Sequence, residues 1–158
     1  MKMIAMVVAA VTMAACDRTT NSTRTPFISF APTTAIEAQL SPQTLPLVVV
    51  DTTRCTSGTA FATGFDLVIV QTGPGDVFID RVEWRLIDGS VLGGPAITIP
   101  QPLLTSMFGS TRVVGTRAFS FQPQFACGRT RPGSIAGKVV LKDADGAFRT
   151  ISVDAPFR

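Results

Sequence analysis

The stretch KVVLKDADGAFRTISVD, residues 138–154, decides the fold class. Val139 and Leu141 alternate with Lys138, Val140 and Lys142. After the turn DADG, Ile151 and Val153 alternate with Thr150, Ser152 and Asp154. Alternation with a period of two around a short Asp/Gly turn is typical of a β-hairpin with one buried face. The sequence therefore predicts an antiparallel hairpin at the C-terminal end of the chain.

Upstream, the period of two continues. In residues 78–86, we place Phe78, Val82, Trp84 and Leu86 on one face, and Arg81, Glu83 and Arg85 on the other, which indicates a sheet with one wet side. The turn Gly73-Pro74-Gly75-Asp76 precedes this strand, with Pro and Gly placed for type II geometry. Further short strands are expected at residues 36–40, 45–50, 65–70, 96–99 and 119–127, the last with Cys127 on its core face. For residues 34–40, a short helix opened by a Thr34/Glu37 capping box is the alternative.

About seven or eight short strands separated by turn signals indicate an all-β, two-sheet sandwich. In layout, residues 35–157 resemble the immunoglobulin-like domains of bacterial surface and periplasmic proteins, and Trp84 resembles the buried tryptophan of such folds. We therefore expect an immunoglobulin-like β-sandwich domain over residues 35–158.

The N-terminal segment has the pattern of an export signal. Lys2 precedes an apolar run over residues 3–15, too short for a transmembrane helix, which needs about 20 residues. The run ends in Met13-Ala14-Ala15-Cys16, which resembles the lipobox of bacterial lipoproteins. The resemblance implies a signal peptide at residues 1–15, acylation of Cys16 as by palmitate, and anchoring in the cell membrane. In enterobacterial lipoproteins an aspartate at the position of Asp17 implies retention at the periplasmic face of the inner membrane. Ordinary secretion, with cleavage after Ala14 or Ala15, is the alternative.

Lipidation would also explain the number of cysteines. The chain has three cysteines, an odd number that needs an explanation in an exported protein. With Cys16 acylated, Cys55 and Cys127 are free to form a disulfide bond outside the cytoplasm, although two buried free thiols are the alternative. Residues 16–34 are mostly polar and are expected to form a flexible tether between the lipid and the domain.

The composition excludes several kinds of chemistry. The chain contains no histidine, so serine or cysteine nucleophiles with a histidine base and His-ligated zinc are excluded. Asp143 and Asp145 are predicted to serve a turn rather than bind calcium. The remaining acidic candidates for glycan cleavage are Asp76, Asp80, Glu83 and Asp88, but nothing in the sequence brings two of them together. We predict no catalytic residue, metal site or cofactor.

Two surfaces are candidates for partner binding. Between Gly89 and Lys142 the chain has no acidic residue, and a basic surface there would face an envelope protein or an anionic glycan; its candidates are Arg112, Arg117, Arg129 and Arg131. Compensation by acidic neighbours in space is the alternative. The other candidate is the loop 101–116, whose Leu103, Leu104, Met107 and Phe108 either plug the sandwich or present an apolar contact.

The sequence thus predicts a membrane-anchored lipoprotein of the cell envelope, a non-enzymatic binding or structural module. Its expected partner is the lipid bilayer, contacted through acylated Cys16. The net charge of +3 is too small to indicate nucleic-acid binding. The alternatives are a carboxylate-based envelope enzyme acting on glycans and an accessory subunit of an envelope complex.

Overall fold

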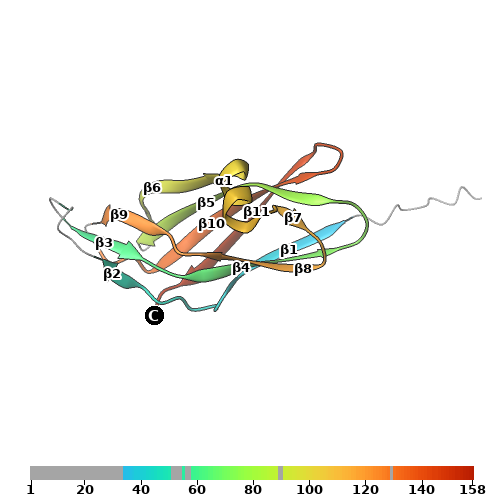
Figure 1. Ribbon diagram of the computed structural model, residues 1–158. Helices are drawn as coiled ribbons and strands as arrows, with labels where there is room; N and C mark the ends of the chain where they lie inside the picture. Colours follow the sequence, from blue (N-terminus) through green and yellow to red (C-terminus); the bar gives the residue numbers. More distant parts are fainter. Residues whose placement is uncertain (1–33, 51–54, 56–57, 89–90, 129) are drawn as a thin grey trace, which may run out of the picture. The chain divides into compact units, whose positions relative to one another are not determined.

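The computed structural model describes residues 34–50, 55, 58–88, 91–128 and 130–158 (Figure 1). The expected all-β fold is confirmed, because the described elements are eleven strands and one short helix. The strands are β1 (Ala35–Ser41), β2 (Val48–Val50), β3 (Thr59–Ala62), β4 (Phe65–Thr72), β5 (Val77–Asp88), β6 (Val91–Pro100), β7 (Arg112–Val113), β8 (Thr116–Phe121), β9 (Gln124–Gly128), β10 (Ser134–Asp143) and β11 (Phe148–Pro156). The helix is α1 (Gln101–Phe108).

The strands form a two-sheet sandwich. One sheet has the order β11-β10-β5-β6, with β7 paired to the start of β5. Facing it are two three-stranded ladders, β1-β4-β8 and β2-β3-β9, in which β3 leads directly into β4 and β8 into β9. These ladders are interrupted at Thr63-Gly64 and Gln122-Pro123, where proline lacks the N–H that a continuous ladder would need.

Buried Thr63 joins the interruptions. Its hydroxyl donates to the carbonyl of Pro46 at 2.7 Å, and its N–H donates to the carbonyl of Pro123 at 3.3 Å. The polar groups released by the break thus keep hydrogen-bond partners, as buried backbone groups require. The break between the two facing ladders is therefore bridged by hydrogen bonds.

Trp84 lies at the centre of the core, as expected. Its side chain is fully buried, and its ring meets Phe65 and Phe121 of the facing sheet edge-on, with centroids 4.8 and 5.3 Å away. On the neighbouring strand, the indole lies against Gly137, where an added Cβ would come within 2.2 Å of Trp84 Cζ3. The tryptophan occupies the space that a side chain at position 137 would fill.

The C-terminal hairpin is confirmed. β10 pairs antiparallel with β11 from Ser134↔Pro156 to Lys142↔Phe148, and Gly146 at the turn has a φ of 84°, which favours glycine. Asp143 and Asp145 lie at this turn, where Asp143 forms an ion pair with Arg149 at 2.7 Å.

The predicted phase of the long strand is wrong at its beginning. Val77 and Ile79 are buried whereas Phe78 is only half-buried, although Val82, Trp84 and Leu86 are buried as expected. The cause is a β-bulge: Val140 pairs with Arg81 but Leu141 pairs with Ile79, so Asp80 is an extra residue in β5. The bulge exchanges the two faces of the strand.

Three further features concern β1, β6 and the connection between β1 and β2. Residues 35–41 form strand β1, not a capped helix. The strand expected at residues 96–99 is longer than predicted, because β6 runs through Gly93-Gly94-Pro95 with a register shift, where Gly94 has a φ of 86°. Between β1 and β2 the chain bonds to the end of β11 and the residues after it. The N–H of fully buried Leu45 donates to the carbonyl of Pro156, and the Leu45 carbonyl accepts from the N–H of Arg158.

Candidate functional site

The outer face of the five-stranded sheet carries a depression of about 280 Å³. Two cross-strand rows form it, Glu83–Lys138–Ser152 and Arg85–Ala136–Asp154, each running from β5 through β10 to β11. Directly paired residues of antiparallel strands point to the same side of a sheet. The small side chains of Ala136 and Ser152 therefore leave space between longer charged ones.

This depression combines both signs of charge. Glu83 accepts a hydrogen bond from Arg81 Nε at 3.2 Å, and Arg81 also pairs with Asp80 at 3.2 Å. Among the residues that the structure describes, Arg85, Lys138 and Asp154 make no ion pair. These three charged groups are therefore available to a partner that presents both signs, such as a polypeptide.

A second depression, of about 300 Å³, adjoins the first across β11. It shares Ser152, Val153 and Asp154 with the first and adds Ala38, Gln39, Leu40 and Gln43 from β1 and the turn after it. In the sheet orders, β11 and β1 are both edge strands, although the carbonyl of Pro156 at the end of β11 accepts a hydrogen bond from the Leu45 N–H. Edge strands offer unpaired backbone groups. The surface formed by the two depressions, which we call the β11-edge surface, thus combines charged side chains with a strand edge.

This surface was not predicted as a unit. Alternation placed Glu83 and Arg85 on a wet face and Ser152 and Asp154 on the polar face of the hairpin, and Lys138 counted only toward the excess of basic residues along the sequence. The missing information is the pairing of β5 with β10, which joins residues more than fifty positions apart. No short-range pattern carries that register.

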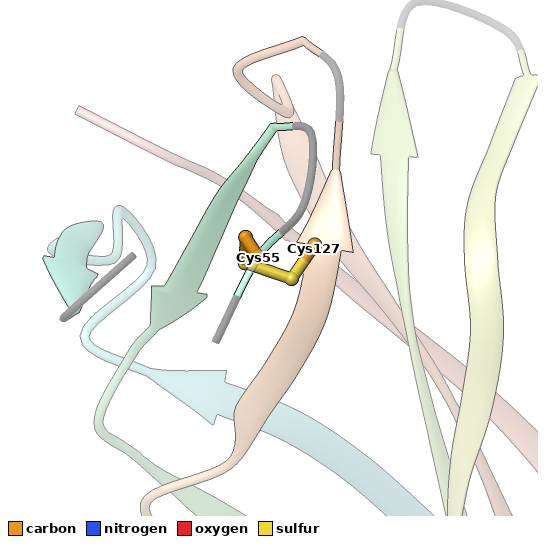
Figure 2. Close-up of a disulfide and its surroundings, with 2 residues drawn as sticks. All are labelled: Cys55 and Cys127. Carbon is orange, nitrogen blue, oxygen red and sulfur yellow. A yellow bond between two sulfur atoms is a disulfide. The ribbon is translucent and has the colours of Figure 1, made fainter. Parts of the chain in front are cut away.

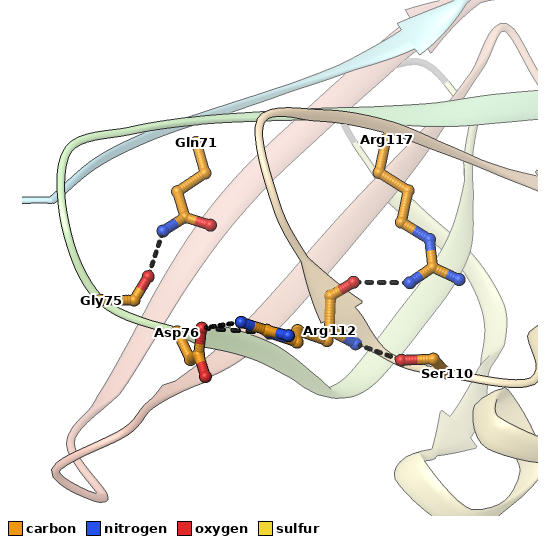
Figure 3. A network of polar contacts seen from close by, with 6 residues as sticks. All are labelled: Gln71, Gly75, Asp76, Ser110, Arg112 and Arg117. Carbon is orange, nitrogen blue, oxygen red and sulfur yellow. Dashed lines mark hydrogen bonds and ion pairs between the residues drawn. The ribbon is translucent and has the colours of Figure 1, made fainter.

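Arg112 and Arg117 come together near the beginning of β5, where Arg112 pairs with Phe78, but both bind other groups of this protein (Figure 3). Arg112 donates through Nε and Nη2 to Asp76 at 3.0 and 2.6 Å. Arg117 donates to the carbonyls of Arg112, at 2.5 Å, and Phe108, at 3.4 Å, and its guanidinium lies 4.6 Å from the Phe119 ring centroid. Both arginines therefore hold β7 and the end of α1 in place.

The predicted basic surface is not one patch. Arg112 pairs beside Phe78, whereas Arg131 donates to the carbonyl of Arg158 and precedes Ser134, which pairs with Ile87. The nine positions between Phe78 and Ile87 correspond to roughly 30 Å along a strand. Arg129 lies outside the described residues. The excess of basic residues along the sequence is partly compensated in space, as in the contact of Arg112 with Asp76.

Of the carboxylates considered for catalysis, only Asp80 and Glu83 share a binding partner, Arg81, and each of the four is engaged within the described residues. Asp76 binds Arg112, Asp80 and Glu83 bind Arg81, and Asp88 accepts a hydrogen bond from the Thr130 hydroxyl. Within the described ranges, no group of three or more acidic or cysteine side chains could hold a metal ion.

Of the two roles considered for the segment 101–116, the structure shows that of a plug. Leu104 is fully buried, and Phe108 packs edge-on against Phe119 and Phe121, with centroids 5.3 Å away, so α1 closes the sandwich. Leu103 and Met107, one turn apart, are each about half exposed, at 49% and 47%.

Cys55 and Cys127 are joined in a disulfide with Cα atoms 5.7 Å apart (Figure 2). The expected position of Cys127 in the core is wrong, because Cys127 is exposed while Phe119, Phe121 and Phe125 are buried. The strand continues past the end of the core, where alternation no longer means burial. The bond therefore joins surface segments at the end of the domain.

The proposed acylation site Cys16 and the lipobox residues Met13, Ala14 and Ala15 lie outside the described residues. No helix within the described ranges has the length and hydropathy needed to cross a membrane.

Neither a protein-family model nor a curated protein matches the chain. Two similar solved structures are the structural-genomics target SoR45 and the putative ApaA protein from Bordetella pertussis. SoR45 has a TM-score of 0.48 and 8% identity, over 77% of this chain and 85% of the other. For the ApaA protein the TM-score is 0.43 and the identity 14%, over 79% of this chain and 89% of the other. At TM-scores below 0.5, neither match assigns a function to this chain.

Proposed function

We propose that this protein is a lipid-anchored lipoprotein of the bacterial cell envelope whose sandwich domain is a non-enzymatic binding module. The observation that carries the proposal is the sequence Met13-Ala14-Ala15-Cys16 at the end of a short apolar run that follows Lys2. Acyl chains on Cys16 would hold the protein at the bilayer, since each buried CH₂ contributes about 0.8 kcal/mol and two chains suffice for stable anchoring.

The disulfide supports export. A bond between Cys55 and Cys127 persists in an oxidising compartment and leaves Cys16 as the one cysteine of the chain outside it. A signal peptide delivers the chain to such a compartment. Anchor, export and cysteine pairing are thus mutually consistent.

We assign binding of an envelope partner to the β11-edge surface. It combines the edge strand β11 with Arg85, Lys138 and Asp154, which make no ion pair in the described part of the chain. A polypeptide segment satisfies both features, because its backbone can pair with the edge while its side chains contact the charges. Glycan cleavage, the alternative, needs two carboxylates about 5–10 Å apart in one cleft. Asp80 and Glu83 both bind Arg81, but Asp80 lines neither depression.

Metabolic labelling with a palmitate analogue tests the anchor. The wild type should be labelled and sediment with membranes, and Cys16→Ser should lose both properties. Cys55→Ser/Cys127→Ser is the matched control, since it removes two cysteines and should retain the label. A wild type that is unlabelled and freely soluble would refute the proposal.

Crosslinking in intact cells tests the binding module. A photo-crosslinking residue in place of Ser152 should yield a discrete adduct that Arg85→Glu/Lys138→Glu weakens, whereas the same residue in place of exposed Val49 should not. Equal adducts at positions 152 and 49 would contradict the assignment.

A further inference from the structure

A row of alternating cations and aromatic rings crosses four strands at one end of the sandwich. The register pairs Arg112 with Phe78, Phe78 with Lys142, and Lys142 with Phe148, so the four side chains follow one another from β7 to β11. Directly paired residues share a face. This is the outer face, because the neighbouring pair Val77 and Val113 is buried.

The row is exposed. Phe148 is 59% exposed, and Lys142 Nζ lies 5.7 Å from the centroid of its ring. The side chain of Arg112 is 51% exposed, and Val114, two positions further along, is 63% exposed. Large apolar side chains at the surface are ordinary when scattered singly. Here Phe148 lies beside Lys142, and Val114 follows Arg112 at the same end of the domain.

The chain that leads back to Cys16 reaches the domain at this same end. Arg149, next to Phe148, donates through Nη1 to the carbonyl of Thr34 at 2.9 Å, and the Thr34 hydroxyl donates to the carbonyl of Pro74. Thr34 directly precedes β1. Thr34, the first described residue, therefore lies beside the Phe148 end of the row. We call the row together with Thr34 and Arg149 the tether end.

We infer that the tether end rests on the bilayer, with Phe148 at the level of the lipid headgroups and Lys142 facing their phosphates. This inference rests on the proposed acylation of Cys16, because the anchor keeps the tether end near the membrane. Residues 17–34 span at most about 65 Å when fully extended. A short tether raises the effective concentration of the surface, so a weak contact suffices.

The charges indicate a modest electrostatic contribution. Asp76 offsets Arg112, and Asp143 offsets Arg149, whereas Lys142 makes no ion pair among the described residues. A basic residue at an anionic surface strengthens binding on the order of five-fold. An aromatic ring beside a cation suits the interface between headgroups and acyl chains.

Such contact also fixes how the β11-edge surface is presented. Ser152 and Asp154 lie four and six positions beyond Phe148 in β11, which corresponds to roughly 13–20 Å along the strand. The β11-edge surface would then meet partners close to the membrane.

Tryptophan fluorescence on vesicles tests the inference. The chain from residue 16 onward is coupled through the Cys16 thiol to maleimide lipids in vesicles of phosphatidylcholine and phosphatidylglycerol, with or without brominated acyl chains. Cys55 and Cys127 are already joined, so Cys16 is the coupling position. The variant Phe148→Trp should show a blue-shifted spectrum and at least two-fold stronger quenching by brominated lipid than Val49→Trp, a matched control that is 61% exposed in β2. The native Trp84 is fully buried and provides the background.

Adding Lys142→Glu to Phe148→Trp should weaken the contact at least five-fold on anionic vesicles, which lowers the quenching there, and should leave the quenching nearly unchanged on pure phosphatidylcholine. Equal quenching at positions 148 and 49 would overturn the inference, as would a Lys142→Glu variant that quenches as before on anionic vesicles. Because the coupling is chemical, these results do not depend on acylation in cells. A failed vesicle test would therefore refute the membrane contact of the tether end, whereas failed palmitate labelling would refute the acylation of Cys16.

Discussion

Replacing Gly137 by alanine is expected to destabilise the sandwich by about 3 kcal/mol, the upper part of the range for overpacked cores. The new Cβ would lie 2.2 Å from Trp84 Cζ3, 2.6 Å from Cε3 and 3.0 Å from Val153 Cγ2. An ordinary contact needs more than 3.4 Å, so the indole must retreat by more than an ångström. Phe65 and Phe121 block that retreat, because both already touch the ring edge-on.

Urea unfolding followed by fluorescence measures this effect cleanly, because Trp84 is the only tryptophan and the chain has no tyrosine. With a slope of about 2 kcal/mol per molar urea, the midpoint of Gly137→Ala should fall by about 1.5 M. Gly64→Ala is the matched control, since its Cβ would meet nothing closer than 3.8 Å, and its stability should stay within about 0.5 kcal/mol.

A double variant identifies the cause. In a Trp84→Phe background the smaller ring leaves space, so Gly137→Ala should then cost less than about 1 kcal/mol, as followed by circular dichroism. An unchanged midpoint for Gly137→Ala in the wild-type background would refute the packing of Trp84 on Gly137.

Three further predictions concern stability, each measured by urea unfolding. Cys55→Ala/Cys127→Ala should cost about 4 kcal/mol, because the bond closes a loop over a sequence separation of 72; a loss below 1 kcal/mol would contradict this. Leu104→Ala should cost about 3 kcal/mol because Leu104 is fully buried, whereas Leu103→Ala on the exposed side of α1 should change stability by less than about 0.5 kcal/mol; equal losses would show that α1 does not close the sandwich. Thr63→Val should lower the stability by about 1–2 kcal/mol, since it leaves the Pro46 carbonyl without the buried hydroxyl; a neutral effect would mean that the break between the two ladders does not depend on this hydrogen bond.

Much of the fold is predictable from local pattern. The hairpin of β10 and β11 has strict alternation and a turn whose glycine adopts a positive φ, so both its strands and its loop were anticipated. Trp84 was also correctly expected in the core. These features depend on residues close together in sequence, where side-chain periodicity and backbone sterics act directly.

The errors arise where a local rule is interrupted. Alternation assigned Phe78 to the core face, but the bulge at Asp80 shifts the phase of β5 by one residue. It also assigned Cys127 to the core, but burial ends before the strand does. A bulge and the edge of a core are both set by the facing elements.

The candidate surfaces needed the tertiary register. A run of basic residues suggested one surface, yet Arg112 lies against Asp76, thirty-six positions away. Conversely, the rows Glu83–Lys138–Ser152 and Arg112–Phe78–Lys142–Phe148 are formed by strands that are distant in the chain. Only strand pairing brings these side chains to one face.

Mass spectrometry of the protein purified from bacterial membranes tests the central claim most directly. The account predicts that the mature chain begins at Cys16 and that this residue carries a diacylglyceryl group. A mature chain that begins at another residue, or that begins at Cys16 without lipid, would contradict the account.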